Sequence, residues 1–182
     1  MSTPAYLVDF VPALGLKHIS ASELMIGVDK GNDPPPRELL GNGALVLTLW
    51  DDARAWFTQD RGYDCPVKLT SFYRSEAFNS ATKDSSQFSQ HQGCFAGDGK
   101  IKGVPAAEVQ AYFRHRHGSK VVLPAWAVRN PVRVAAGQLP YAELETIRGA
   151  DFQVVTWIGG IGDYYSFTHL DSRGGMAARW KG

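Results

Sequence analysis

The hydrophobic pattern of the chain changes between helical and extended spacing. Apolar side chains recur at helical intervals over residues 42–57, where Asn42 can cap the first turn, and this predicts a helix. Residues 66–73 alternate apolar and polar side chains and predict a strand. A second helix is expected over residues 106–117, because its apolar positions share one face and Gly118 follows its last turn.

The segments between these elements are less regular. The prolines of residues 31–36 indicate an extended turn, and the polar stretch 75–93 indicates a long loop with short helical turns. Further elements are expected as a short strand over residues 97–102, β-rich segments over 121–128 and 132–136, and a short helix over 141–148.

Two strands close the pattern. Residues 152–158 and 165–171 are rich in β-branched and aromatic side chains, and the glycine-rich segment 159–162 joins them. Helices and strands are mixed without a regular β-α-β alternation. The sequence therefore predicts an α+β fold with a mainly antiparallel sheet, in a single domain of 182 residues.

Composition excludes several classes of protein. The formal net charge is +1, which gives no reason to expect a nucleic-acid partner. No apolar stretch is long enough to span a bilayer, and residues 1–15 lack the basic start and long apolar run of a signal peptide. Cys65 and Cys94 are too few for a disulfide framework, and we expect two reduced thiols.

Histidine and aspartate residues supply the candidate chemistry. His91 and Asp98 are seven residues apart, and Gly93 and Gly97 between them allow the backbone to turn so that both side chains point to one place. Imidazole and carboxylate groups are zinc ligands, and a catalytic zinc site uses three of them and keeps one position open. Taken alone, such a pair is more often structural or solvated.

A third ligand is suggested by the last predicted strand. Phe167, His169 and Asp171 share one strand face, and a carboxylate on a buried face is costly without a partner. The alternative is that this is the solvent face of an edge strand, with Thr168 and Leu170 inside.

These residues resemble the zinc D-alanyl-D-alanine carboxypeptidases and related peptidoglycan endopeptidases that share a fold with the Hedgehog signalling domain. The hallmark of that family is Ser-x-His-x-x-Gly-x-Ala-x-Asp, followed downstream by His-x-Asp or His-x-His. The chain has Ser89, His91, Ala96 and Asp98 in register, and the second motif falls at His169 and Asp171. The resemblance covers residues 19–180. Within the family, the chain is similar to the compact subgroup found in phages and bacteria. The resemblance implies a central sheet flanked by helices.

The chain departs from the family pattern at several points. Cys94 stands where the family has glycine, and Gly99 follows Asp98 where an apolar residue is usual. Residues 119–148 match nothing in the compact subgroup, and an insertion on the surface is favoured over one that covers the cleft.

Carried over by position, the resemblance implies that His91, Asp98 and His169 hold Zn²⁺, with water in the fourth place. Asp171 would accept the proton of that water or orient His169, and the two roles stay open. Relatives often place the base carboxylate before the last ligand, where this chain has Ser166, so Asp163 is a weaker candidate for the base.

Other side chains have a functional and a structural interpretation. Arg74 is placed to grip a substrate carbonyl or carboxylate, or to form a structural ion pair. Tyr165 and Trp180 could line a peptide groove, although core packing is the default. Cys94 is expected to be a buried thiol rather than a fourth ligand, and His115 and His117 to suit the end of a helix rather than a metal.

The resemblance thus implies a zinc metallopeptidase that cuts an amide bond in peptidoglycan stem peptides, as a carboxypeptidase or as a cross-link endopeptidase. Two alternatives are a wall-binding or virion module with a structural metal, and a cytosolic D,D-dipeptidase. We expect a monomer without a nucleic-acid partner. Because no signal peptide is visible, we expect synthesis in the cytoplasm and action on the wall after phage-type release or from a virion.

Overall fold

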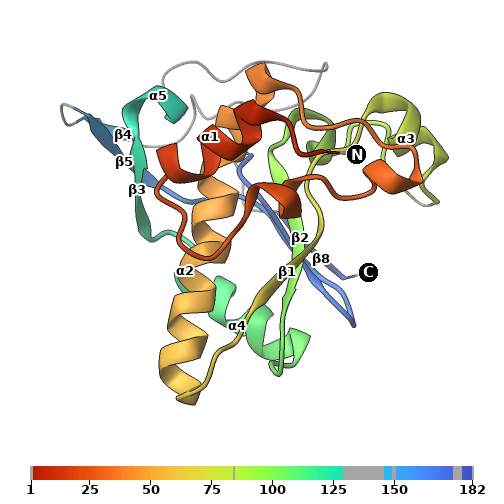
Figure 1. Ribbon diagram of the computed structural model, residues 1–182. Helices are drawn as coiled ribbons and strands as arrows, with labels where there is room; N and C mark the ends of the chain where they lie inside the picture. Colours follow the sequence, from red (N-terminus) through yellow and green to blue (C-terminus); the bar gives the residue numbers. More distant parts are fainter. Residues whose placement is uncertain (1, 84, 129–145, 149–150, 174–177, 182) are drawn as a thin grey trace.

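The structure is a computed structural model that describes residues 2–83, 85–128, 146–148, 151–173 and 178–181 (Figure 1). Its helices are α1 (Ala5–Ala13), α2 (Ala44–Arg61), α3 (Glu76–Ala81), α4 (Ala106–Arg116) and α5 (Ala125–Val128), with the 3-10 turns η1 (Ala21–Leu24), η2 (Val28–Lys30), η3 (Arg37–Gly43) and η4 (Gln90–Gly93). Its strands are β1 (Val67–Ser71), β2 (Ala96–Ile101), β3 (Lys120–Pro124), β4 (Thr146–Arg148), β5 (Phe152–Thr156), β6 (Ile161–Asp163), β7 (Thr168–Asp171) and β8 (Arg179–Lys181).

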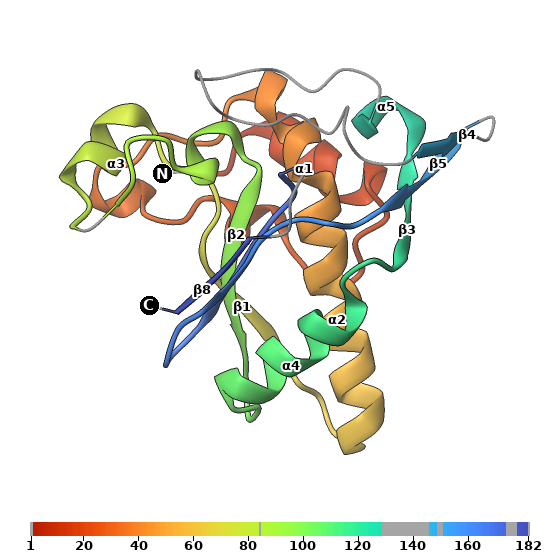
Figure 2. The ribbon, with the colours of Figure 1, turned by 180° about the vertical axis from the view of Figure 1, so that it is seen from behind.

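The strands form two sheets. The larger has the order β1-β2-β7-β6-β8, in which β6 and β8 are parallel and the other pairs are antiparallel. The smaller sheet has the order β3-β5-β4, and its strand β3 contacts α2 (Figure 2). The fold is therefore α+β with a mainly antiparallel central sheet flanked by helices, which confirms the prediction.

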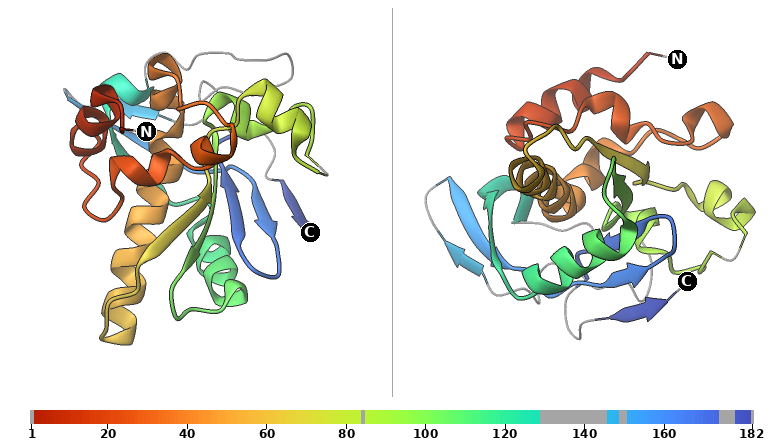
Figure 3. Two further views of the ribbon diagram at one scale, coloured as in Figure 1. Left: turned by 45° about the vertical axis from the view of Figure 1, so that its right-hand side comes forward. Right: turned by 90° about the horizontal axis from the view of Figure 1, so that it is seen from below.

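Helices α2 and α4 pack together against one face of the larger sheet (Figure 3). The ring of Trp50 in α2 lies against β2, where a Cβ on Gly99 would come within about 3.0 Å of it. Phe113 of α4 meets the same tryptophan ring edge to face, with the ring centroids 4.9 Å apart. Glycine in β2 thus allows the helices to approach the sheet closely, and the other face of β2 carries Asp98.

Several predicted elements need correction. The side-chain amide of Asn42, the expected helix cap, donates to the carbonyl of Gly93, 2.8 Å away, and α2 begins at Ala44 rather than directly after Asn42. The β-rich segment 121–128 is a strand only to Pro124 and continues as α5. The short helix expected over 141–148 is wrong at 146–148, which form β4, whereas 141–145 and the segment 132–136 lie outside the described residues.

The N-terminal segment forms a helix that the sequence analysis missed. In α1 the side chains of Leu7, Phe10 and Val11 are buried, and the helix packs on η1 and η3. Both cysteines are buried and neither forms a disulfide bond, as expected. Among the described helices, none has the length and apolarity needed to cross a membrane.

Candidate metal centre

A single row of residues crosses the larger sheet and carries the candidate ligands. The strand register places Ser71 of β1 opposite Asp98 of β2, and Asp98 opposite His169 of β7. The row continues through Gly162 of β6 to Trp180 of β8. Residues directly opposite one another in neighbouring strands have their side chains on the same face. The register alone therefore brings together groups that are far apart in sequence.

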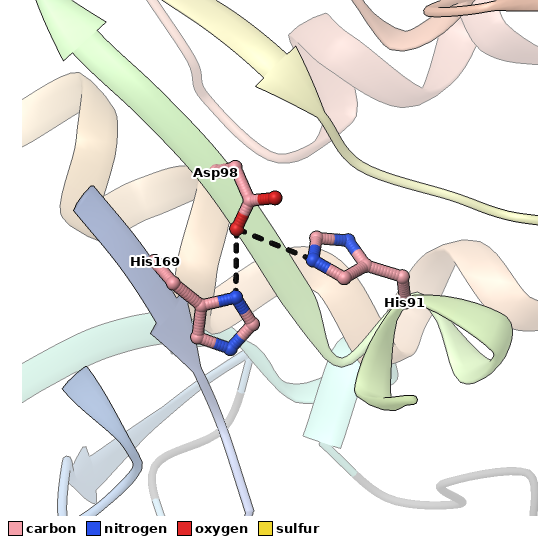
Figure 4. Close-up of side chains that lie close together, drawn as sticks. All are labelled: His91, Asp98 and His169. Atoms are coloured by element: carbon pink, nitrogen blue, oxygen red, sulfur yellow. Dashed lines mark hydrogen bonds and ion pairs between the residues drawn. The ribbon is translucent and has the colours of Figure 1, made fainter. Parts of the chain in front are cut away.

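The three predicted ligands meet on this face (Figure 4). Asp98 Oδ1 lies 2.7 Å from Nδ1 of His169 and 3.3 Å from Nε2 of His91. His91 reaches the row from η4, the short helical turn that precedes β2. All three residues are buried, and within the described residues they are the group whose ligand atoms lie within 4.8 Å of one another.

The hydrogen bonding of His91 indicates that a cation belongs in this site. Its Nδ1 lies 2.8 Å from the carbonyl oxygen of Phe72, which can only accept, so Nδ1 carries the proton. In the neutral ring Nε2 then presents a lone pair toward a carboxylate oxygen of Asp98, and this buried Nε2 has no hydrogen-bond partner. Two facing acceptors are stabilised by a cation between them, and two imidazoles with a carboxylate are a donor set that zinc accepts. The residues present therefore fit a zinc ion.

The acid–base properties of the three groups agree with this fit. Burial lowers the pKa of His91, which keeps its ring neutral. Burial alone would raise the pKa of Asp98, but the neighbouring His91 and His169 outweigh it and hold the pKa well below its usual range. Burial alone would lower the pKa of His169, but hydrogen bonds to Asp171 and Asp98 outweigh it and raise the pKa to about 9. In the metal-free protein a proton on His169 thus occupies the place where a metal would bind.

Asp171 holds the second nitrogen of the His169 ring. Its Oδ2 lies 3.4 Å from Nε2 of His169 and accepts from Nε of Arg173 at 2.8 Å. Its Oδ1 accepts from the backbone N–H groups of Gly160, at 2.7 Å, and Arg173, at 3.1 Å. The carboxylate is completely buried, and the Gly160 contact requires glycine, because a Cβ there would lie 2.5 Å from Oδ2.

The edge-strand alternative for this segment does not hold. Strand β7 lies between β2 and β6, and all four of its residues are buried. His169 and Asp171 therefore face the site from the middle of the sheet, with Leu170 in the core on the opposite face.

The backbone turns between the first two ligands at Cys94. Its φ is 60°, a left-handed conformation that favours glycine, and this is the position where the resembled family has glycine. Gly97 lies within β2 and Gly93 within η4, so neither glycine makes the turn that was attributed to it. The Cys94 thiol is buried, burial raises its pKa, and it is not among the ligand atoms that meet around Asp98 in the described chain.

The ligands open onto a hollow of about 720 Å³, which we call the metal hollow. The turn between β6 and β7 contributes Tyr164 and Phe167 to its lining, and β8 contributes Trp180. Trp180 leans over Gly162 and packs at 5.0 Å from the His169 ring, while its indole N–H donates to the hydroxyl of Tyr164. The loop that leads into η4 contributes further lining residues, which are polar apart from Phe88.

Arg74 also lines the metal hollow and is held on two sides. Its Nε donates to the hydroxyl of Ser71 at 2.9 Å, and a terminal nitrogen pairs with Oδ2 of Asp98 at 3.1 Å. Arg74 thus forms the structural ion pair that was one of its two expected roles, and its partner is the carboxylate of the candidate ligand Asp98. Arg74 also lines the metal hollow, so the second expected role, substrate binding, stays open.

Two predicted site residues lie away from the metal hollow. Tyr165 is fully exposed and does not line it, whereas its neighbour Tyr164 does and stacks on Phe167 with ring centroids 4.2 Å apart. Asp163 pairs with Arg114 of α4 at 2.7 Å, outside the lining. Arg173, which the sequence analysis did not assign, lines the hollow and packs over the Trp180 ring.

Within the described residues, the fold places a buried His-Asp-His group that could hold a metal at the edge of an open hollow, which is the arrangement of a mononuclear metal hydrolase. Residues 24–128 match the family model of peptidase M15, over more than half of the chain. The chain belongs to the peptidase M15 family. Members of this family are zinc-dependent, and membership supports a zinc metallopeptidase.

The matched segment contains Arg74, His91 and Asp98 and ends before His169, which the structure brings next to His91 and Asp98 as the third candidate ligand. Searches among curated proteins and among solved structures found no match for the chain.

The His169 pKa generates a prediction for metal binding. At pH 7 His169 carries a proton in the metal-free protein, because its pKa is about 9, whereas His91 and Asp98 are already deprotonated. Zinc needs the neutral imidazole, so its binding releases a proton from His169. Calorimetry in buffers of different ionisation enthalpy is expected to show release of at least about one proton per zinc at pH 7, and the share that comes from His169 disappears above about pH 10, which leaves only the proton of zinc-bound water. His169→Ala abolishes zinc binding and His115→Ala retains it. Tight binding by wild-type protein without proton release at pH 7 would contradict the assignment.

Proposed function

We propose that the chain hydrolyses an amide bond in peptidoglycan stem peptides, as a D,D-carboxypeptidase or as a cross-link endopeptidase that uses zinc. The observation that carries the proposal is the group of His91, Asp98 and His169, which meets at the edge of the metal hollow within a chain of the peptidase M15 family. The substrate class comes from the family resemblance, whereas the residues support metal-assisted amide hydrolysis.

Zinc held by the three ligands would polarise the scissile carbonyl and lower the pKa of water toward about 7. The residues of the chain supply orientation and charge around it. We assign to Arg74 the binding of a substrate carbonyl or carboxylate, because its guanidinium faces the metal hollow while Ser71 and Asp98 hold it in place. A guanidinium anchored in this way loses little freedom when substrate binds.

We assign to Asp171 the positioning of His169 rather than the acceptance of a proton from water. Both of its oxygens are already hydrogen-bonded, it has no exposed surface, and it does not line the metal hollow. A carboxylate behind a ligand histidine fixes the ring orientation and increases the basicity of the ligand nitrogen. Among the described residues, Asp98 is the carboxylate that lines the hollow, so neither Asp171 nor Asp163 is suited to act as a separate base.

Two observations bear on the alternative functions. A structural metal would be enclosed by four protein ligands, but in the described part of the chain the group contains three, and Cys94 is turned into the apolar core. This favours a catalytic site over a structural one. A free dipeptide would suit a small closed pocket, whereas the metal hollow has a volume of about 720 Å³ and is bordered by exposed Phe88.

We further propose that the protein reaches its substrate by phage-type release or as part of a virion. The proposed substrate lies outside the cytoplasmic membrane, and a chain with a formal net charge of +1 is compatible with either route.

Digestion of purified cell walls tests the proposed activity. Zinc-loaded protein is expected to release free D-alanine or shortened peptides, and a chelator should abolish the release until zinc is restored. His91→Ala is the matched inactive variant, and His115→Ala the matched active control, because His115 lies on α4 away from the ligands. No released peptide from zinc-loaded wild-type protein would refute the enzymatic proposal.

The role of Asp171 is tested by Asp171→Asn, which keeps the shape and removes the charge. If Asp171 positions His169, zinc affinity falls by about 10- to 100-fold, and kcat at saturating zinc falls only a fewfold. Competition with a chromophoric chelator measures the first quantity, and turnover with a soluble peptide the second. Asp163→Asn should leave both unchanged. A normal zinc affinity with a kcat reduced by about 10²- to 10⁴-fold would instead assign proton transfer to Asp171.

Expression in a Gram-negative host tests the proposed route. Lysis is expected when the protein carries an added export signal or is co-expressed with a membrane-permeabilising protein, and no lysis is expected from the protein alone. The His91→Ala variant with the same export signal is the control. Normal growth despite verified export of folded, zinc-loaded wild-type protein would contradict action on the wall.

A further inference from the structure

Phe88 stands between two hollows. Its side chain is 52% exposed, and it lines both the metal hollow and a neighbouring hollow of about 620 Å³. We call the neighbour the second hollow, which Tyr73, Glu76 and Gln92 also line. A ligand that extends out of the metal hollow over Phe88 would therefore enter the second hollow.

The turn that carries the ligand His91 also presents one amide side chain to each hollow. Gln90 lines the metal hollow and Gln92 lines the second hollow, on either side of His91 in η4. The side-chain oxygen of each glutamine is buried and makes no hydrogen bond within the described chain. Leaving a buried polar group unpaired costs about 1–3 kcal/mol, and a peptide backbone offers both donors and acceptors to such an amide. Each of these two oxygens therefore lacks a donor within the described chain, and an N–H group of an extended peptide would supply one.

The two hollows differ in charge. The metal hollow is lined by Arg74, Lys83 and Arg173, and its described carboxylate, Asp98, is already paired with Arg74. In the second hollow Glu76 is the charged residue of the lining, and it is exposed. A ligand that spans both hollows is thus favoured when it has a carboxylate on the side of the metal and a cationic group on the side of Glu76.

We propose that the second hollow is a subsite for the part of a substrate peptide that extends beyond the cleaved bond, and that it selects a cationic side chain or free amino group. The inference rests on the proposed peptidase function and makes it more specific. The substrate class is an extended or cross-linked peptide that bears an amine, rather than a free dipeptide. Gln90 and Gln92 bind its backbone on the two sides of Phe88, and Glu76 attracts its amine.

Matched peptides and variants test the subsite. Three extended peptides carry lysine, norleucine or glutamate at one position beyond the cleaved bond, and a short peptide lacks the extension. Wild-type protein is expected to favour lysine over norleucine by about two- to fivefold in kcat/KM, mainly through KM. Glu76→Gln should remove this preference, and Glu76→Lys should transfer it to the glutamate peptide.

Gln92→Leu tests the backbone contact separately. It is expected to lower kcat/KM by about fivefold for all three extended peptides and to leave the short peptide unchanged. Gln59→Leu, on an exposed position of α2 outside both hollows, is the matched control and should change neither. Zinc content and thermal unfolding of each variant are measured alongside, so that a loss of folding is recognised.

The two proposals fail in distinguishable ways. If wild-type protein cleaves all the peptides alike and neither Glu76 nor Gln92 variants alter the ratios, the subsite is refuted and the peptidase function stands. If zinc-loaded protein cleaves none of them, the function is refuted, and calorimetric affinities for the same uncleaved peptides decide the subsite. Affinities that follow the lysine, norleucine and glutamate order support the subsite, and equal affinities overturn it.

Discussion

The structure depends on the cost of burying the Asp98 carboxylate. A buried charge is tolerated only when oppositely charged or hydrogen-bonding groups compensate it. Asp98 is compensated by His169 at 2.7 Å, by Arg74 at 3.1 Å, and by the cation that the lone pair of His91 requires. His169 comes from β7, Arg74 from the segment that follows β1, and His91 from η4. The carboxylate thus joins three segments that are far apart in the sequence, and its need for a cation makes the place where they meet a candidate metal site.

The sheet fixes the positions of the groups that surround the Asp98 carboxylate. The row from Ser71 through Asp98, His169 and Gly162 to Trp180 follows from strand register, so the ligands sit on rigid elements. Glycines then determine what can approach the row. The lack of a side chain at Gly162 lets the Trp180 ring reach His169, and the lack of one at Gly160 lets its backbone N–H reach the Asp171 carboxylate. The same strands that carry the ligands therefore also build the wall of the hollow and the support behind the ligands.

The sequence predicted the long elements for physical reasons, and the family resemblance predicted the His-Asp-His group that the structure brings together. Helix α2 and strand β1 have full amphipathic periods, so their patterns were readable. The spacing of Leu7, Phe10, Val11 and Leu14 was equally helical, and α1 could have been found from it. The expected placement of Tyr165 did not hold because β7 begins only at Thr168, and side-chain alternation has no meaning in the turn before a strand.

Other features depend on contacts that no local pattern contains. The central position of β7 arises from pairing with β2 and β6, and the sequence could not distinguish it from an edge strand. The hydrogen bond from the Asn42 amide to the carbonyl of Gly93, which ties the segment before α2 to the η4 turn, likewise has no local signature in the sequence. Arg173 gave no signal, because its importance comes from Asp171 and Trp180.

The most direct test of the account is the X-ray absorption spectrum of the zinc-loaded protein at the zinc edge. The account predicts only nitrogen and oxygen neighbours, at about 2.0–2.2 Å, with the signature of two imidazole rings and no sulfur. Removing one ring in the His169→Ala variant should abolish that spectrum. A sulfur neighbour at about 2.3 Å, or a spectrum that is unchanged when His91 or His169 is replaced, would contradict the site described for this chain.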